Sequence, residues 1–448
     1  MKAQGQRILS ELNDLKRTIK ACANELGWNL QEVENIIKGE TTPDLMEAFI
    51  KVMCETYPVN RADLEINADD TRLGIKIMHA AASKKSARIF ERHDRYGNLT
   101  PYYEYRDTAT SRLCAFRPEW IKELRVVNDK NSQNPDVIYN NGHFMHQITF
   151  FVGPVNFYYD INGHKTCEIM STGDSNYITP YFPHSFTSRN VKEEAYIVAV
   201  TFGGDVHRAL NELYRMGKNR ASKYLINTKN TMAGVQDLLD YHLKNELLTR
   251  DLLQKRLKVV AQPVDIMDRS KTFSLFELEA IADHLGVEVT DLTLPPHRQD
   301  EVVVVKKRVD VESYYFPSNE KAHYKIWPGA RCRMMPLVKS FNIEILSNAS
   351  LTSPEFENGL YTYVFNYSSG TAMLFWRFEK KIYSEILEPE DSVCIQPFIP
   401  YGYRKHSPHE DVKLFSVSIP SSINLSVQRE MSGFATFDRV ASEDKCWF

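Results

Sequence analysis

The spacing of hydrophobic positions divides the chain into four stretches. Over residues 3–66, apolar residues recur every three or four positions, which predicts short amphipathic helices. Over residues 88–203, short aromatic and β-branched runs alternate with Gly, Pro and Asn turns, a pattern typical of an antiparallel sandwich or barrel. Helical spacing returns over residues 206–292, and a second β-rich stretch runs from residue 301 onward. The predicted order is therefore helical, β, helical, β.

The two β-rich stretches match each other without gaps at an offset of 217 residues. Between residues 141 and 184, ten of 44 positions are identical, and most of these carry residues that determine turns. The identical pairs are Asn141/Asn358, Gly142/Gly359, Gly153/Gly370, Glu168/Glu385, Ile169/Ile386, Asp174/Asp391, Ser175/Ser392, Ile178/Ile395, Pro180/Pro397 and Pro183/Pro400. This repeat predicts an α+β chain with a helix-turn-helix-like domain at 1–70, a barrel at 71–205, a second such helical domain at 206–297 and a second barrel at 298–448.

Composition and charge exclude several classes of function. The 448 residues, 43% of them hydrophobic, can form more than one core. The 55 Lys and Arg against 58 Asp and Glu give a formal net charge of −3, without the basic excess of a nucleic-acid-binding protein. The seven scattered cysteines contain no CxxC pair, which favours a reducing cytoplasm over a disulfide framework or zinc module. Because the sequence shows neither a signal peptide nor a membrane-spanning run, we expect a cytoplasmic protein with no nucleic-acid or membrane partner.

Comparison of the two barrels separates architectural residues from candidates for chemistry. A residue kept in both copies is expected to support the fold, whereas a ligand used in one copy is free to disappear from the other. The polar residues of the first barrel that disappear in the second include His143 (Leu360), Gln147 (Val364) and His184 (Tyr401). These three are the candidate metal ligands.

The pattern around these residues can direct them to one point. On a strand, positions 143, 145 and 147 share a face, so His143 and Gln147 can converge inside the barrel while His146 points away. His184 follows a turn, a short strand and a proline-set corner that can return its imidazole to the same interior. Two imidazoles and one oxygen donor match the arrangement of non-haem Fe(II) oxygenases, although their third ligand is normally a carboxylate. Alternatively, all three are hydrogen-bonded core residues.

The nearby carboxylates are interpreted as structural. Glu168 and Asp174 both recur in the second copy, as Glu385 and Asp391, where the other three polar residues are absent. A neutral Gln147 oxygen leaves the metal with its full positive charge, which favours a substrate that supplies negatively charged oxygens.

The motifs together resemble a known family. The repeated helical-plus-cupin layout, the segments NNGHFMHQ and GDSNYITPYFPHSF, and the degenerate second barrel resemble the iron-dependent phosphonate oxygenases, which include 2-hydroxyethylphosphonate dioxygenase, over nearly the whole chain. The resemblance implies cupin (double-stranded β-helix) barrels and Fe(II) bound by His143, Gln147 and His184, and we expect a homo-oligomer. The chain departs from the dioxygenase pattern at two positions, with Gln147 in place of an apolar residue and Ile178 in place of a glutamate.

The resemblance also implies roles for four further residues. Arg95, Tyr105 and Asn140 match the family's phosphonate-binding arginine, tyrosine and asparagine, and Lys16 matches its mobile lysine. Lys16 and Tyr105 are in addition the candidate catalytic residues. The arginine match requires a two-residue insertion, so Arg92 is the alternative to Arg95. Each of these residues also has an ordinary interpretation as a surface or packing residue.

The two-His, one-Gln variant implies a particular reaction. It is the Fe(II)- and O2-dependent cleavage of the C–C bond of 2-hydroxyethylphosphonate to methylphosphonate and carbon dioxide, in which the substrate supplies all four electrons and no 2-oxoglutarate or reductant is needed. Cleavage to hydroxymethylphosphonate and formate is the alternative within the enzyme class.

A function of a different class is also open. Helix-turn-helix domains joined to cupins are the plan of small-molecule-responsive transcription regulators. The candidate recognition helix, NLQEVENIIKG, carries Glu32 and Glu34 and only Lys38, which would repel DNA phosphates.

Overall fold

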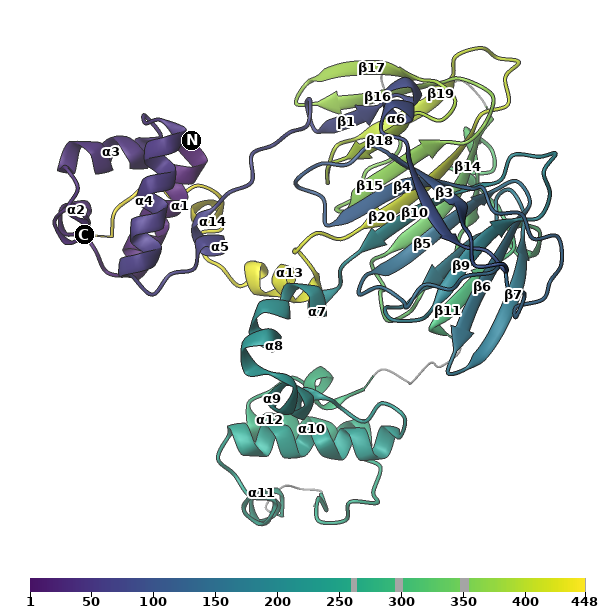
Figure 1. The fold of residues 1–448 in the computed structure, drawn as a ribbon. Coiled ribbons are helices and arrows are strands. Elements are labelled where there is room, and N and C mark those ends of the chain that lie inside the picture. Colours follow the sequence, from purple (N-terminus) through teal and green to yellow (C-terminus); the bar gives the residue numbers. More distant parts are fainter. Residues whose placement is uncertain (259–263, 295–300, 347–353, 448) are drawn as a thin grey trace.

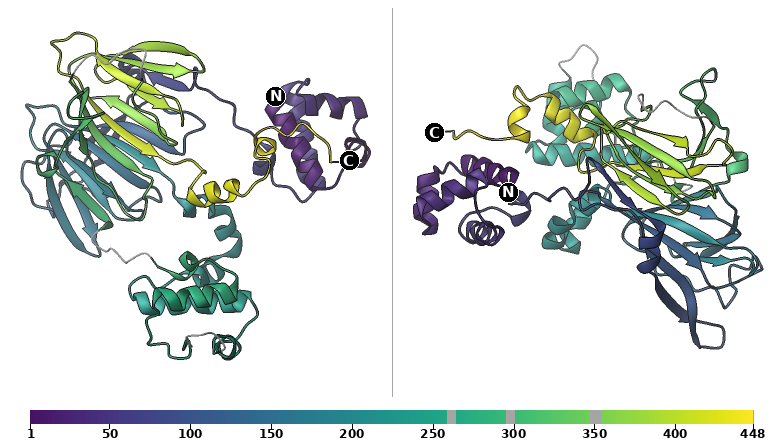
Figure 2. Two further views of the ribbon diagram at one scale, coloured as in Figure 1. Left: turned by 180° about the vertical axis from the view of Figure 1, so that it is seen from behind. Right: turned by 90° about the horizontal axis from the view of Figure 1, so that it is seen from above.

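Two groups of strands lie side by side, and two groups of helices stand away from them (Figure 1). The computed structural model describes residues 1–258, 264–294, 301–346 and 354–447. An extended segment joins the N-terminal helices to the strands, and they stand apart from the sheets in the further views as well (Figure 2). The mixed helical and β-sheet content predicted from the sequence is confirmed.

Short helices with well-defined ends form the N-terminal group. The side chains of Thr18, Asn29 and Thr42 accept hydrogen bonds at three helix starts, and Gly27 and Gly39 end two helices with φ of 71° and 75°. The apolar faces of these helices enclose a core of their own. The helices are α1 (Lys2–Asp14), α2 (Ile19–Leu26), α3 (Leu30–Lys38), α4 (Pro43–Thr56) and α5 (Arg61–Leu64).

The second helical group follows the first set of strands. A capping box between Ser274 and Glu277 begins its last α-helix, and Gly286 ends that helix with a φ of 64°. Buried leucines form a separate core here. The elements are α7 (Asp205–Arg208), α8 (Leu210–Met216), α9 (Lys218–Ala221), η1 (Ser222–Tyr224), α10 (Thr231–Asn245), α11 (Arg250–Leu257), α12 (Leu275–Leu285) and η2 (Val289–Leu292).

Each set of strands forms one seven-stranded and one three-stranded sheet. The elements of the first half are β1 (Ile75–Met78), α6 (Ala80–Lys85), β2 (Arg88–His93), β3 (Leu99–Asp107), β4 (Phe116–Glu123), β5 (His146–Val152), β6 (Val155–Ile161), β7 (His164–Met170), β8 (Ser175–Ile178), β9 (His184–Ser188) and β10 (Tyr196–Phe202). Those of the second half are β11 (Val303–Lys306), η4 (Arg308–Asp310), β12 (Tyr314–Phe316), β13 (Tyr324–Pro328), β14 (Lys339–Ile345), β15 (Tyr361–Asn366), β16 (Ala372–Phe378), β17 (Lys381–Leu387), β18 (Ser392–Ile395), β19 (Tyr401–Lys405) and β20 (Lys413–Ile419).

The two large sheets have the same strand order, with one strand exchanged between them. The orders are β11-β8-β5-β10-β4-β3-β2 and β1-β18-β15-β20-β14-β13-β12. The edge strand β1 precedes the strands of the first half but pairs with β18 of the second, and β11 precedes the strands of the second half but pairs with β8 of the first. Segment 71–205, predicted as one barrel, therefore supplies strands to both sets: β1 joins the second set, and the other strands of the segment stay in the first.

Aspartate and serine side chains kept in both copies hold the exchanged segments. The carboxylate of Asp174 accepts from the backbone N–H of Arg308 at 2.8 Å, directly after β11. The carboxylate of Asp391 accepts in the same way from Ala80 at 2.7 Å, close after β1. The neighbouring serines accept from backbone N–H groups of the opposite half, in the pairs Ser175/Ala330 and Ser392/Ala109, each at 2.9 Å. The sequence repeat therefore marks contacts between the halves.

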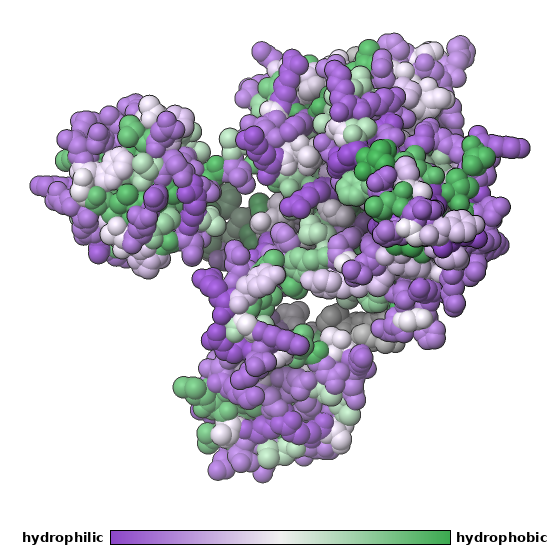
Figure 3. Space-filling view, viewed as in Figure 1, coloured by the Kyte–Doolittle hydropathy of each residue, from purple (hydrophilic) through white to green (hydrophobic). Residues whose placement is uncertain are grey.

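The central strands are buried on both faces. One face of β5 and β10 lines the interior of the first set of strands, and the other packs against the second set, where Phe150 stacks on Phe415 with ring centroids 4.7 Å apart. This double burial explains why most positions of β5 (HQITFFV) and β10 (YIVAVTF) are apolar, without the alternation of a strand that is buried on one face only. The face in Figure 3 is mostly hydrophilic, with hydrophobic residues interspersed over the sheets.

The C-terminal segment returns to the N-terminal helices (Figure 2). It contains α13 (Leu425–Ser432) and α14 (Asp438–Ala441). Asn13 at the end of α1 is buried, its amide donates to the carbonyl of Lys445 at 2.9 Å, and its oxygen accepts from the N–H of Trp447 at 3.1 Å. Among the helices that the structure describes, none combines the length and the apolar character needed to cross a bilayer.

The contacts of Asp391 predict a large loss of stability when its carboxylate is removed. In Asp391→Ala, the backbone N–H groups of Ala80 and Glu388 lose the buried carboxylate that accepts from them, so the free energy of unfolding should fall by about 2–3 kcal/mol in denaturant titration. The matched control is Asp411→Ala, whose exposed carboxylate pairs with Lys413 and should change the unfolding free energy by less than about 0.5 kcal/mol. Equal effects of the two variants would contradict an anchoring role.

Candidate functional site

His143, Gln147 and His184 meet at the wall of one cavity in the first set of strands. His143 Nε2 lies 3.0 Å from Gln147 Oε1, and the His143 and His184 rings are 5.1 Å apart between centroids. Gln147 lies on β5 and His184 begins β9. His143 was predicted on a strand, but it precedes β5. Its imidazole still points toward Gln147, because Gly142 adopts a φ of 72° and His143 Nδ1 contacts the Met145 carbonyl at 2.8 Å.

Both imidazoles keep one nitrogen available as a ligand. His143 Nδ1 lies 2.8 Å from the Met145 carbonyl, and His184 Nδ1 lies 2.9 Å from the Phe182 carbonyl. Because a carbonyl oxygen only accepts, each Nδ1 carries the proton and each Nε2 presents a lone pair. Burial lowers the pKa of His184 to about 4, so this imidazole is neutral at physiological pH. Neutral imidazole is the form that binds metal ions.

The Gln147 amide is oriented so that its oxygen faces His143. Its Nε2 donates to Thr149 Oγ1 at 2.7 Å, which leaves Oε1 opposite the lone pair of His143 Nε2. In this tautomer both atoms are acceptors 3.0 Å apart, an arrangement that a cation beside both would stabilise. Two ligands held at right angles about 2.1 Å from a metal ion lie about 3.0 Å apart, so this spacing fits coordination. Two imidazoles and an amide oxygen are donors that suit Fe(II).

Asn140 connects the segments that carry the two histidines. Its side-chain oxygen accepts from the N–H groups of Gly142 at 2.9 Å and His184 at 3.0 Å. Its Nδ2 donates to His184 Nε2 at 3.0 Å, the nitrogen that would coordinate a metal. Coordination at that nitrogen would free the Asn140 N–H to donate to a bound ligand.

The rest of the cavity wall combines a cation, aromatic rings and a carboxylate. Arg92 and Tyr105 line it, as do Glu119 and Thr201, which the sequence had not singled out. The guanidinium of Arg92 donates to the Ile138 carbonyl at 2.6 Å. Burial raises the pKa of Tyr105 to about 12, so its phenol stays protonated as a hydrogen-bond donor.

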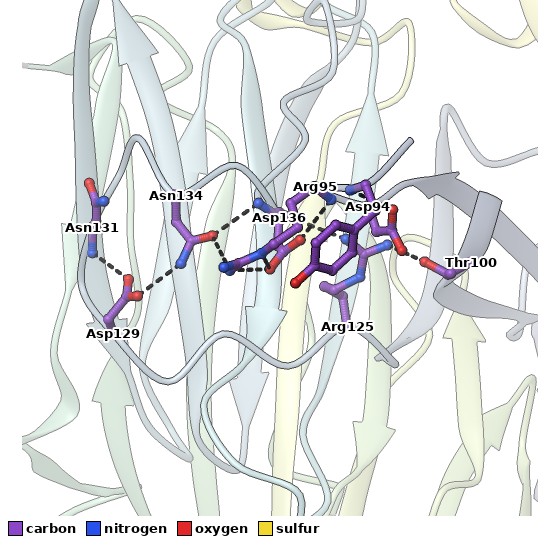
Figure 4. Close-up of polar contacts among 9 residues, drawn as sticks. Asp94, Arg95, Thr100, Arg125, Asp129, Asn131, Asn134 and Asp136 are labelled. Atoms are coloured by element: carbon purple, nitrogen blue, oxygen red, sulfur yellow. Dashed lines mark hydrogen bonds and ion pairs between the residues drawn. The ribbon is translucent and has the colours of Figure 1, made fainter. Parts of the chain in front are cut away.

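Arg95 lies outside this wall. Its guanidinium donates from Nε to Asp136 Oδ2 at 2.7 Å and its backbone N–H to the same carboxylate at 2.9 Å, in a network with Asn134 (Figure 4). The structure therefore brings Arg92, the alternative considered from the sequence, to the cavity in place of Arg95. A β-bulge between Phe90 and Glu91 shifts the register of β2 just before Arg92.

Lys16 is not among the residues that line the cavity. It follows α1 with a φ of 58°, and its ammonium donates to the Asp14 carbonyl at 3.0 Å. The same ammonium lies 4.2 Å from the centre of the Trp447 ring in the C-terminal segment. This conformation satisfies the charge of Lys16 away from the candidate ligands.

The carboxylates predicted to be structural do not approach the cavity wall. Asp174 binds the backbone after β11, and Glu168 on β7 lies 3.7 Å from the Lys307 ammonium. Within the part of the chain that the structure describes, no three His, Cys, Asp or Glu residues are arranged to hold a metal. A metal at the histidines would therefore depend on the amide of Gln147.

Strand β4 carries two glutamates on its inward face. Glu119, Ile121 and Glu123 alternate along the strand, and the first two line the cavity. Glu119 accepts from Arg88 at 2.9 Å, and burial raises the pKa of its carboxyl. The alternation in FRPEWIKE was a signal available in the sequence, because a strand that buries Ile121 on one face buries both glutamates with it.

Glu123 is buried without a hydrogen-bond partner. Its side chain is 4% exposed, and neither carboxyl oxygen contacts a donor among the described residues. Burial raises the pKa of Glu123 well above its usual value, which favours the protonated carboxyl in the folded state.

The second set of strands places core residues where the first has Gln147 and His184. Val364 and Tyr401 belong to its hydrophobic core, and Tyr401 stacks on Phe356 with centroids 5.4 Å apart. The hydroxyl of Tyr324 donates to the Tyr403 carbonyl in the same interior at 2.9 Å.

Comparison with curated proteins supports the predicted family. The chain is 36% identical to methylphosphonate synthase of Nitrosopumilus maritimus (strain SCM1), over 99% of this chain and 95% of that protein. No protein-family model matches the sequence. The family resemblance predicted from the motifs is confirmed by this relative.

Solved structures share the fold over the full length. Streptomyces albus HEPD, solved with its substrate 2-hydroxyethylphosphonate and Fe(II) bound, is 29% identical and superposes with a TM-score of 0.86, covering 100% of this chain and 99% of that one. PhpD with cadmium atoms gives a TM-score of 0.75 at 17% identity, covering 97% of this chain and 98% of that one, which is a likeness of fold alone.

The raised pKa of Glu123 predicts that the stability of the fold decreases as pH rises. Its raised native pKa means that the folded state keeps a proton which the unfolded state releases above about pH 4.3, so stability is lost as pH increases from that value. Glu123→Met should raise the unfolding temperature, and by more at pH 8 than at pH 5.

Glu123→Gln is the matched variant, because it keeps the size and polarity but cannot ionise. Glu123→Gln should remove the same pH-dependent loss of stability, but it should not raise the unfolding temperature at pH 5 as Glu123→Met does. Thermal unfolding at both pH values checks this, and differences from wild type that do not change with pH would show that Glu123 ionises alike in both states.

Proposed function

This chain belongs to the iron-dependent phosphonate oxygenase family that includes methylphosphonate synthase, and on that premise we propose that it converts 2-hydroxyethylphosphonate and O2 to methylphosphonate and carbon dioxide. The observation that carries the proposal is the convergence of two imidazoles and one amide oxygen on a single cavity. Fe(II) in this cavity would supply a site for O2 activation next to the bound substrate.

The neutral ligand set favours an anionic substrate. His143, Gln147 and His184 would hold Fe(II) without contributing negative charge, so the full charge of the ion remains to attract the phosphonate oxygens and the hydroxyl of the substrate. A carboxylate in place of Gln147 would bind the ion more tightly but would cancel part of that attraction. Substrate should therefore strengthen iron binding in this chain.

Arg92, Asn140 and Tyr105 are the proposed phosphonate partners. Arg92 provides the cation of the cavity wall, Asn140 an N–H beside His184, and Tyr105 a buried phenol that remains a donor. Lys16 would join them only after leaving the carbonyl of Asp14 and the ring of Trp447, which agrees with its expected role as a mobile residue.

The finer architecture is part of the proposal. Each pair of large and small sheets is assigned as a cupin barrel, and each helical group as a helix-turn-helix-like domain, within the boundaries 1–70, 71–205, 206–297 and 298–448. Support comes from the shared strand order and from the well-capped α2, α3, α11 and α12. We also propose a homo-oligomer in the cytoplasm.

Formation of hydroxymethylphosphonate and formate is the second candidate. It is favoured by the similarity to Streptomyces albus HEPD, at 29% identity over the full chain. The two reactions share a substrate and differ in their products.

Product analysis tests the proposal. The full chain is loaded with Fe(II) without oxygen, mixed with 2-hydroxyethylphosphonate, exposed to air and followed by phosphorus NMR. Methylphosphonate as the main product is expected. Hydroxymethylphosphonate would establish the second candidate, and unchanged substrate in iron-loaded protein would overturn both.

The positions of the two arginines give opposite expectations for their variants. Arg92→Ala should weaken substrate binding about tenfold or more, because a charge-assisted contact to a dianion contributes about 1.5–3 kcal/mol. Arg95→Ala is the matched control, since its guanidinium pairs with Asp136 outside the cavity. Titration of each variant with substrate under anaerobic conditions measures the difference, and a larger loss in Arg95→Ala would reverse the assignment.

Gln147 separates this proposal from a site with a carboxylate ligand. Gln147→Ala should lose iron-dependent turnover and the increase in iron affinity that substrate produces. His146→Ala should retain much of both, because His146 faces away from the cavity and contacts the Tyr177 hydroxyl at 2.7 Å. Iron binding is measured with and without substrate. Normal turnover in Gln147→Ala, with loss of iron in a folded Glu168→Ala variant, would place the third ligand on a carboxylate.

A further inference from the structure

Two cysteines from opposite halves of the chain face each other between the large sheets. Cys114 lies in the loop between β3 and β4, and Cys394 lies on β18. Their sulfur atoms are 2.7 Å apart, although 280 residues separate them in sequence. Cys394 is fully buried in the core between the halves, whereas Cys114 is partly exposed at its edge.

The loop that carries Cys114 is held in place by Asp70. This carboxylate accepts from the hydroxyl of Ser111 and the N–H of Arg112, and it also pairs with Lys76 on β1. Lys76 is the cross-strand partner of Cys394 on β18. One carboxylate therefore fixes the loop beside the strand that bears the second thiol.

We propose that Cys114 and Cys394 form a reversible disulfide that joins the two halves when a small disulfide oxidant, such as oxidised glutathione, is present. The Cys114 thiolate attacks one sulfur of the oxidant, forms a mixed disulfide and releases one glutathione. The Cys394 thiolate then attacks the Cys114 sulfur and releases the second glutathione. Two thiol protons pass to the two glutathione molecules, so the protein loses two electrons and the oxidant gains them.

Exposure and position determine the order of the two steps. Cys114 is the thiol that a soluble oxidant reaches, and Cys394 is enclosed between β1 and β15 behind it. The hydrogen bond with Cys114 and burial both raise the pKa of Cys394 well above its usual value. Both effects and its burial keep Cys394 from reacting with free oxidant, whereas its sulfur, 2.7 Å from that of Cys114, is in place to attack the neighbouring mixed disulfide.

The bond would tie together a long loop of the unfolded chain. Closing 280 residues removes much of the freedom of the unfolded state, so the linked protein should unfold at a higher temperature than the reduced protein. The link would join the β3–β4 loop of the half that holds the candidate ligands to β18, the strand that receives β1. The disulfide would form in this chain whatever its substrate.

The experiment treats the full chain with oxidised glutathione, blocks the remaining thiols under denaturing conditions and maps unreduced peptides by mass spectrometry. A peptide pair joined through Cys114 and Cys394 is expected, together with a raised unfolding temperature that reducing agent reverses. Modification of the exposed Cys446 in the same sample shows that the oxidant was active.

Two variants test the order of reaction. Cys394→Ser should accumulate glutathione on Cys114, and Cys114→Ser should leave Cys394 unmodified. Cys446→Ser is the matched control and should still form the cross-link. Recovery of Cys114 and Cys394 as free thiols in wild type, or of Cys114 as a persistent mixed disulfide, while Cys446 is modified, would overturn the proposal.

Discussion

The fold depends on a reciprocal exchange in which each half of the chain holds the backbone of the other. Asp174 binds the segment that follows β11, and Asp391 binds the segment that follows β1. Both carboxylates are buried, so these hydrogen bonds form away from competing water and an unmade one is costly. Both copies keep an aspartate at this position because each half uses it to bind the backbone of the other half. Strands β5 and β10 are consequently central and buried on both faces, which gives Gln147 a rigid support.

The sequence predicted the candidate ligands because the repeat provides an internal comparison. Gly, Pro, Asp and Ser recur where the backbone requires them, and His143, Gln147 and His184 stand out as polar positions that do not recur. The structure brings these three to one wall. What they bind remains a proposal, supported by the opposed acceptors of His143 and Gln147.

Other features had no local signature in the sequence. The pairing of β1 with β18 joins residues more than 300 positions apart, and no periodicity reports a partner at that distance. Arg92 lies on β2 and lines the cavity, whereas Arg95 follows the end of that strand. The sequence pattern does not report the residue at which so short a strand ends. His143 reaches Gln147 through a bend and not along a strand, because Gly142 adopts a positive φ. Contacts of Lys16 with the C-terminal segment likewise arise only in three dimensions.

The difference between the two halves follows from one physical requirement. A set of strands that directs lone pairs into its interior is stabilised when a cation or another donor meets them, whereas an interior filled by Val364 and Tyr401 has no such requirement. The second half can therefore devote its interior to packing, and through β1, β18 and the Asp391 contacts it supports the half whose interior is polar. Loss of ligands in one copy does not weaken the fold, because the contacts between the halves depend on backbone N–H groups and on the Asp and Ser residues that both copies retain. The candidate ligands are thus confined to the first set of strands, while the architecture needs both sets.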